Sequence, residues 1–223
     1  MCTVQKGVAA GVLARYSYKR MNDTADTRLA LIRAARPLFA RLGYAATSVR
    51  AITQAADANL GAITYHFGSK RELYDAVVGA VVEPLADRVE GVVRGGGTVA
   101  ERIGGVVRAY FVYLAENPEL PQLMMQELVL SADPPAAVAG PMMRVQGALR
   151  GLIEEGQASG AVRAGPPMLM SLFILSVPVH LGLLRRALES NLGLNLLEPG
   201  LRAAATEAAV AFVTAGLCEG GGG

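Results

Sequence analysis

The chain has 223 residues, of which 52% are hydrophobic and 18% charged, and it contains 26 glycines and no tryptophan. This length and composition indicate a folded protein with a sizeable core and exclude a disordered chain. Two cysteines, Cys2 and Cys218, supply neither a disulfide framework nor the four ligands of a structural zinc site, which favours a reducing compartment.

The charge is divided unevenly along the chain. Residues 1–75 carry 11 Lys and Arg against 5 Asp and Glu, whereas residues 76–223 carry 10 against 14, so the net charges are +6 and −4. A basic first part suggests contact with a polyanion, and the alternative is chance variation of the surface.

The first 23 residues show no sustained hydrophobic period and mix small residues with basic ones. We predict a flexible basic arm over 1–23, which either follows a groove of DNA or has no role. The basic residues Lys6, Arg15, Lys19 and Arg20 interrupt any apolar run, which argues against a secretory signal.

A helical pattern then begins at Thr24 and ends at Gly43, a residue suited to the position after a helix. Thr47 can serve as the N-cap of a short second helix, and a brief third helix follows over 60–66. Ser69 opens a capping box that starts a fourth helix. Three helices and the start of a fourth are therefore expected in about sixty residues.

The rest of the chain continues with helical periods and shows no strand pattern or internal repeat. We therefore predict an all-α fold. Beyond a glycine-rich loop the expected helices span 98–116, 118–131, 134–158, 167–189 and 199–218.

One stretch, residues 164–184, contains no charged residue and is long enough to span a membrane. Pro178 and His180 interrupt it, and a helix that is apolar over most of its circumference also suits burial by neighbouring helices or by a second subunit. We expect no contact with a membrane. A membrane-anchored helical protein is kept as an alternative.

The short helix, tight turn and second short helix at 47–66 have the spacing of a helix-turn-helix, whose second helix enters the major groove of DNA. The stretch TSVRAITQAADANLGAITYHFGSKREL resembles the DNA-binding unit of the TetR family of transcriptional repressors, and ALIRAARPLFARLGYAATS resembles the first helix of that family. The similarity spans about 28–75. Two positions depart from the family pattern: Asp57 stands where a turn glycine is usual, and Thr64 where an aromatic residue is common.

The resemblance implies an all-α homodimer with two domains in each chain. The N-terminal three-helix DNA-binding domain would cover 24–75, and a helical domain that binds a small effector and dimerises would cover 76–223. Because Asp57 and Thr64 depart from the pattern, no operator sequence is carried over.

Candidate DNA contacts follow from the sides of the two short helices. Ile63 and Phe67, four residues apart, take the inward side of the recognition helix, so its other side can face DNA. The candidates for base contacts are Asn59, Leu60, Gly61 and Thr64. The candidates for phosphate contacts are Thr47, Ser48, Arg50, Tyr65, His66 and Lys70. A structural role for His66 and a solvated charge at Lys70 are the alternatives.

The C-terminal part shows no phosphate loop, no metal-spaced pair and no nucleophile with a partner. We therefore expect no enzyme, no metal and no cofactor. Its aromatic and methionine residues suit an adaptable apolar pocket, although ordinary core packing explains most of them as well. The candidates for effector contact are Tyr110, Met124, Met125, Glu127, Met143, Phe173 and His180, of which Glu127 and His180 are the polar groups expected to orient a ligand.

These observations lead to one hypothesis and one rival of another class. The hypothesis is a cytoplasmic repressor that holds a pseudo-palindromic operator in double-stranded DNA as a homodimer and releases it when an apolar or aromatic small molecule binds. The rival is a ligand carrier whose basic domain has lost operator specificity. Salt-dependent binding without preference between DNA sequences would favour the carrier.

Overall fold

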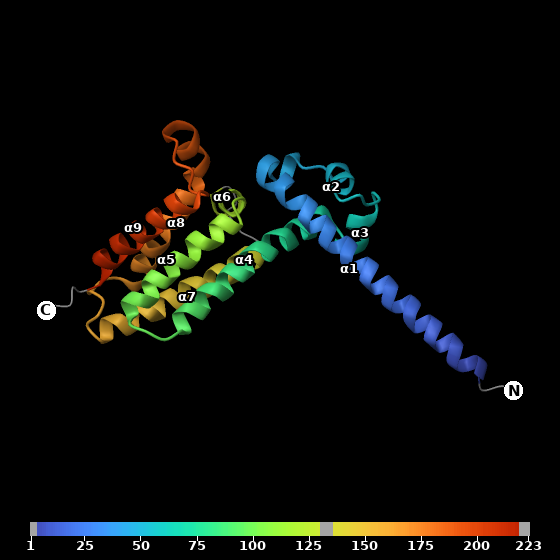
Figure 1. Cartoon of the computed structure of the whole chain (residues 1–223), viewed down its shortest axis with the longest axis horizontal. Helices are drawn as coiled ribbons and strands as arrows, with labels where there is room; N and C mark the ends of the chain where they lie inside the picture. Colours follow the sequence, from blue (N-terminus) through green and yellow to red (C-terminus); the bar gives the residue numbers. More distant parts are fainter. Residues whose placement is uncertain (1–3, 130–135, 219–223) are drawn as a thin grey trace. The chain divides into compact units, whose positions relative to one another are not determined.

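The computed structural model describes the backbone of residues 4–129 and 136–218 and the side chains of residues 25–125 and 136–218. All regular elements in these residues are helices (Figure 1), which confirms the all-α prediction. One isolated antiparallel bridge joins Val162 and Cys218. The chain divides into two compact units, Met1–Val77 and Val78–Gly223.

The first unit holds three helices and the start of a fourth: α1 (Val4–Ala46), α2 (Val49–Ala55), α3 (Ala62–Phe67) and α4 (Lys70–Arg94). Helices α2 and α3 pack against α1 and against each other. Their apolar faces enclose a small core. Its fully buried members include Leu31, Ala35, Phe39, Ile52, Leu73 and Tyr74.

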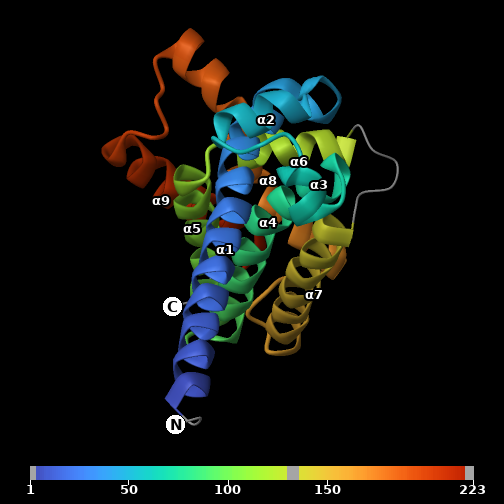
Figure 2. The ribbon, with the colours of Figure 1, turned by 90° about the vertical axis from the view of Figure 1, so that its right-hand side faces the viewer.

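Helix α1 begins at Val4, as Figure 2 shows, so the sequence-based expectation of an arm over 1–23 differs from the structure. That expectation rested on the missing hydrophobic period. Alanine, leucine, lysine and arginine all have high helix propensity, so a segment without a buried stripe can still form a helix. At the other end the prediction is confirmed, because Gly43 has φ 79° and ψ 169° and ends the regular helix.

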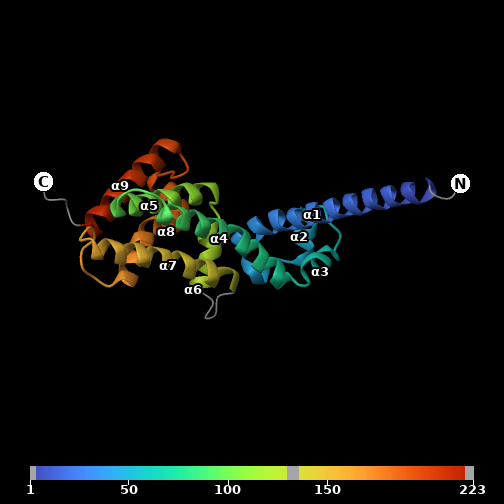
Figure 3. The ribbon, with the colours of Figure 1, turned by 90° about the horizontal axis from the view of Figure 1, so that it is seen from below.

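The second unit holds the rest of α4 and five further helices, which lie close to the predicted ranges. They are α5 (Val99–Glu116), α6 (Leu120–Val129), α7 (Ala136–Ala158), α8 (Pro167–Leu192) and α9 (Pro199–Leu217). Helix α5 packs against α7, α8 and α9, and Figure 3 shows this bundle. Residues 130–131 and 134–135 of the predicted helices lie outside the described residues.

Helix α8 has one face that is buried within the second unit and one open face that is exposed. Met170, Ser171, Ile174 and Pro178 are buried within the unit. The open face is apolar: among the described residues, α8 is the one helix whose length and composition would let it cross a membrane, and only 22% of its most apolar stretch is buried. Its exposed apolar side chains are Met168, Leu169, Leu172, Phe173, Leu184 and Leu192. Apolar side chains exposed in this number on one helix need a cover.

Arg144 of α7 binds three carboxylates on one face of α4. Its Nη1 lies 2.7 Å from Glu83 Oε2, its Nη2 lies 2.5 Å from Asp87 Oδ1, and its Nε lies 2.9 Å from Glu90 Oε1. The hydrogen bond from Arg144 holds the pKa of Glu90 below its usual range, and the reciprocal bond raises the pKa of Arg144. Without the guanidinium, three like charges would repel each other along α4.

Arg144→Met should lower the Tm of the full chain at about pH 7 and have a much smaller effect at about pH 3. The folded-state pKa of Glu90 is lowered, so its ionised form contributes stability above the ordinary carboxyl pKa of about 4.3. That contribution is lost as the pH falls through the lowered pKa. The control is Arg150→Met, because the exposed pair of Arg150 with Glu154 is long, at 3.6 Å. A Tm difference that is equal at both pH values would contradict the expectation.

Candidate DNA-binding surface and ligand cavity

The entry to α2 is built by two neighbouring hydroxyl residues with different roles. Ser48 is the N-cap, since its Oγ accepts a hydrogen bond from the Ala51 N–H at 3.1 Å. The Thr47 side chain is fully buried, and its hydroxyl donates to the Gly43 carbonyl at 2.7 Å. The predicted cap at Thr47 is therefore wrong: its hydroxyl joins the end of α1 to the start of α2 and does not face solvent. Ser48 remains exposed.

Lys70 is held inside the first unit. Its Nζ donates to the Thr47 carbonyl at 2.8 Å and lies 4.4 Å from the centre of the Tyr44 ring. These contacts tie the first turn of α4 to the entry of α2, so Lys70 is not the freely solvated charge that the sequence left open. Its contact with a DNA phosphate stays a prediction.

The turn between α2 and α3 contains Asp57, which has φ 50° and is the one non-glycine residue with positive φ among the described residues. Aspartate visits this left-handed region more readily than most residues, though at some strain. The Ala58 N–H donates to the Thr53 carbonyl at 2.9 Å and closes the turn. An aspartate can thus stand where the resembled family has glycine.

The recognition helix α3 shows the predicted orientation. Ala62 and Ile63 are buried, and Gly61 and Thr64 are exposed. Tyr65 is 74% exposed and packs edge-on against His66 with 4.9 Å between ring centres. All four predicted base contacts, which are Asn59, Leu60, Gly61 and Thr64, face solvent.

Several of these residues share one shallow hollow on the surface of the first unit. Its lining includes Thr27, Asp57, Asn59, Gly61, Tyr65 and His66. On α2, Arg50 is exposed, and within the described residues no ion pair or hydrogen bond engages its guanidinium. Arg50 is therefore the predicted phosphate contact whose charge is free to meet a phosphate.

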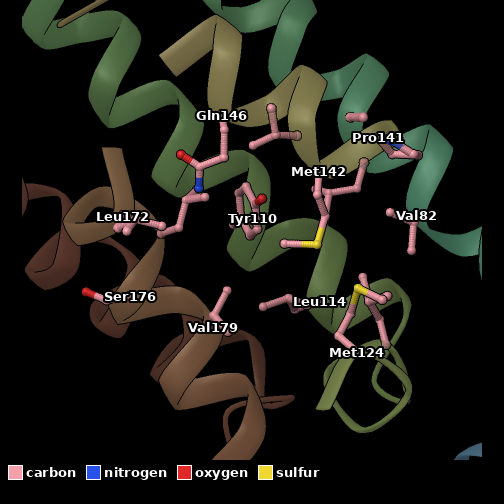
Figure 4. Close-up of a pocket in the computed structure, with 15 residues that line it drawn as sticks. Val82, Tyr110, Leu114, Met124, Pro141, Met142, Gln146, Leu172, Ser176 and Val179 are labelled. Atoms are coloured by element: carbon pink, nitrogen blue, oxygen red, sulfur yellow. The ribbon is translucent and has the colours of Figure 1, made fainter. Parts of the chain in front are cut away.

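A cavity of about 280 Å³ lies in the second unit between α4, α5, α6, α7 and α8 (Figure 4). Its wall is almost entirely apolar, and none of the described residues that line it is charged. Helix α4 contributes Val82, Leu85 and Ala86 to this wall. The polar side chains among the lining residues are Tyr110, Gln146 and Ser176.

The structure brings two of the predicted effector contacts, Tyr110 and Met124, to this cavity. Four others are exposed and do not line it, namely Met125, Met143, Phe173 and His180. Glu127 lies near the end of α6, where the side chains are outside the described residues. The expected orienting role of His180 is therefore not supported by its position.

Sequence reasoning missed Met142 and Gln146 as lining residues, although helical phase contains the signal. Val138, Val145 and Leu149 are buried on α7. Met142 is four residues after Val138 and seven before Leu149, so it shares their side of the helix, whereas Met143 is rotated by about 100° and is 75% exposed.

Tyr110 is 7% exposed, and burial raises the pKa of its phenol far above the usual value, so the hydroxyl is neutral. Within the described residues, no group of three or more His, Cys, Asp or Glu side chains could hold a metal ion. The cavity therefore offers hydrogen bonds and apolar contact without charge.

Comparison with known proteins agrees with this architecture. Residues 31–77 match the family model described as bacterial regulatory proteins, tetR family. A search of curated proteins finds no match. Among solved structures, a TetR family transcription regulator from Marinobacter aquaeolei VT8 superposes with a TM-score of 0.70 at 21% identity, covering 90% of this chain and 100% of that one.

Two further structures have names that mention small molecules. The ketosteroid transcriptional regulator KstR2 of Mycobacterium tuberculosis has a TM-score of 0.69 at 21% identity, covering 86% of this chain and 95% of that one. The transcriptional regulator FadR from Bacillus subtilis, solved in complex with stearoyl-CoA, has a TM-score of 0.67 at 19% identity, covering 84% of this chain and 98% of that one.

These findings confirm the resemblance seen in the sequence. Residues 31–77 have the helix-turn-helix domain of the TetR family, and the chain has the fold of that family's regulators over most of its length.

Thr47→Val should lower the free energy of unfolding of the full chain by about 1–2 kcal/mol, because a buried carbonyl loses its donor while the volume is kept. Urea unfolding monitored by circular dichroism would measure this. Thr64→Val is the matched control, since Thr64 is exposed, and it should change stability little. Equal losses for the two variants would mean that the Thr47 hydroxyl is not the link between α1 and α2.

Proposed function

We propose that this chain is a ligand-responsive repressor that binds a pseudo-palindromic operator as a homodimer in the cytoplasm. A small, largely apolar effector enters the cavity of the second unit and releases the DNA. The observation that carries the proposal is that one helix, α4, begins beside the helix-turn-helix at Lys70 and supplies part of the cavity wall at Val82, Leu85 and Ala86.

The DNA contacts divide by chemistry. Arg50, Ser48 and the exposed end of α3 suit phosphate contact, which positions the protein without reading sequence. Asn59, just before the recognition helix, and Thr64, on the solvent side of that helix, have exposed polar groups that can reach base edges of the major groove. Leu60 and Gly61 add apolar contact and close approach on the same side.

Arg50→Ala should weaken binding to the operator and to a scrambled duplex by a similar factor. It should also flatten the slope of log affinity against log salt by about one unit, because one phosphate contact no longer releases a counterion. Thr64→Ala should instead lower the ratio of operator to scrambled affinity, by about 1–3 kcal/mol at most, with the slope unchanged.

Fluorescence anisotropy over a series of salt concentrations measures both quantities, once the operator has been selected from random DNA with the wild-type chain. The matched control is Gln54→Ala, another exposed polar side chain of α2. If Arg50→Ala changes the ratio and Thr64→Ala changes only the slope, the recognition surface is rotated from the one proposed. If the wild type prefers no sequence, the carrier alternative replaces the repressor.

The dimer is proposed to form through α8 and α9. The first turns of α8 carry four large exposed apolar side chains, Met168, Leu169, Leu172 and Phe173, and Phe212 of α9 is 73% exposed. A second copy of the chain covers such a face by two-fold symmetry and sets the distance between two recognition helices. A membrane would also cover this apolar face, but it would not supply the second recognition helix that the proposed operator binding needs.

Phe212→Glu should convert the homodimer into a monomer in light scattering at micromolar concentration and weaken operator binding, because a charge would be buried in an apolar interface. Met143→Glu is the control, since Met143 is equally exposed but lies on α7. A wild-type chain that is monomeric, or that is recovered only with detergent, would contradict the proposed interface.

Release of DNA is proposed to act through α4 and α7. Helix α7 lines the cavity through Pro141, Met142 and Gln146, and on another side it holds α4 through Arg144. An effector that fits better when these two helices separate shifts the population toward that state, whereas equal affinity for both states would shift nothing.

The names of two similar structures support an apolar effector. KstR2 is called a ketosteroid regulator, and FadR was solved with stearoyl-CoA. In this chain the corresponding support is the cavity wall itself, which consists mainly of aliphatic and methionine side chains.

A further inference from the structure

Where α5 and α7 line the cavity, two hydrogen-bonding groups interrupt a mainly apolar wall; the third polar lining residue, Ser176 of α8, donates its hydroxyl to the Phe173 carbonyl at 2.8 Å. Tyr110 of α5 and Gln146 of α7 both line the cavity, and Figure 4 shows the Gln146 amide reaching from α7 toward its interior. Such convergent polar groups usually fix the orientation of a ligand.

A hydrogen bond from Ser171 sets the orientation of the Gln146 amide. Ser171 of α8 is fully buried, and its Oγ donates to Gln146 Oε1 at 2.6 Å; the same Oγ lies 2.7 Å from the Met168 carbonyl. With Oε1 engaged by Ser171, the Nε2 group is the end of the amide left for the cavity. Within the described residues no hydrogen bond engages Nε2 or the Tyr110 hydroxyl.

The charge of the ligand follows from what the wall lacks. Among the described lining residues none is charged, so a carboxylate or phosphate in the cavity would lose its water without gaining a cation. A purely aliphatic ligand would leave the Gln146 amide without a partner, which also costs free energy.

We infer that the effector is an uncharged, mainly aliphatic molecule with one carbonyl or hydroxyl oxygen, which binds between Gln146 Nε2 and the Tyr110 hydroxyl. This inference rests on the proposed effector site and names the chemical class of its ligand. Gln146 is the residue that selects an uncharged oxygen over a carboxylate.

The test compares ligands with the same chain length: methyl octyl ketone, decanol, decanoate, decanoyl-CoA and decane. Isothermal titration with the full chain and no DNA should give the tightest binding for the ketone or the alcohol. The ketone and the alcohol distinguish a carbonyl oxygen from a hydroxyl oxygen, since the ketone only accepts a hydrogen bond and the alcohol also donates one.

Gln146→Leu should lower the affinity for the ketone or alcohol roughly tenfold and tighten the binding of decane, which no longer leaves an amide unpaired. Tyr110→Phe should lower the same affinity, and Tyr113→Phe is its matched control, since the Tyr113 hydroxyl donates to the Val81 carbonyl and does not line the cavity. Gln146→Arg should reverse the preference and favour decanoate, because it supplies the missing cation.

Equal affinities across the series, tighter binding of decanoate or decanoyl-CoA by the wild type, or no binding of any compound would overturn the inference. Operator release is measured separately by anisotropy with the same compounds. Binding without release would leave the ligand class standing and refute the proposed function. Release by decanoate or decanoyl-CoA would refute the ligand class and leave the proposed function standing.

Discussion

The structure of the DNA-binding domain depends on the hydrogen bond from Lys70 Nζ to the Thr47 carbonyl, which joins the first turn of α4 to the entry of α2. Thr47 connects α1 with α4. Its buried hydroxyl donates to the Gly43 carbonyl at the end of α1, and its own carbonyl accepts a hydrogen bond from Lys70 in the first turn of α4. The Tyr44 ring beneath the ammonium packs against the buried Tyr74 with 5.2 Å between ring centres. A partly buried cation is stable here because it has both a carbonyl and an aromatic face. Any shift of the first turn of α4 therefore displaces the Thr47 carbonyl at the entry to α2.

The same helix is held at its other end by polar side chains. The Tyr113 hydroxyl donates to the Val81 carbonyl at 2.7 Å, and Arg144 bridges the acidic face that begins at Glu83. Pro84 follows Glu83 directly and lies three residues after Val81, and it removes one backbone hydrogen bond from the helix. The weakened turn coincides with the part of α4 that lines the cavity. A ligand that moves this wall thus acts on α4 where its own backbone resists bending least.

Local signals in the sequence predicted much of this structure, whereas contacts between distant residues escaped it. The capping role of Ser69, the end of α1 at Gly43 and the inward side of Ile63 depend on neighbours within one or two turns, and all three are found. The link between Thr47 and Lys70 spans 23 residues and has no local pattern. An apolar pocket was expected, but most of its lining was missed, because the lining is set by how five helices are rotated against one another.

In the proposed homodimer, the charge of the first unit bears on how dimerisation and DNA binding are related. The count of 11 Lys and Arg in residues 1–75 overstates the cations available to DNA, because Lys70 is bound to Thr47 and Arg71 lies 3.0 Å from Asp75. Asp57, in the turn before the recognition helix, adds a negative charge on the proposed DNA side. Affinity for DNA grows with the number of phosphates neutralised, so two such domains would bind more tightly than one. In the proposed homodimer the second contact is intramolecular, so an effector would release DNA by changing the spacing of the two domains without altering any DNA contact.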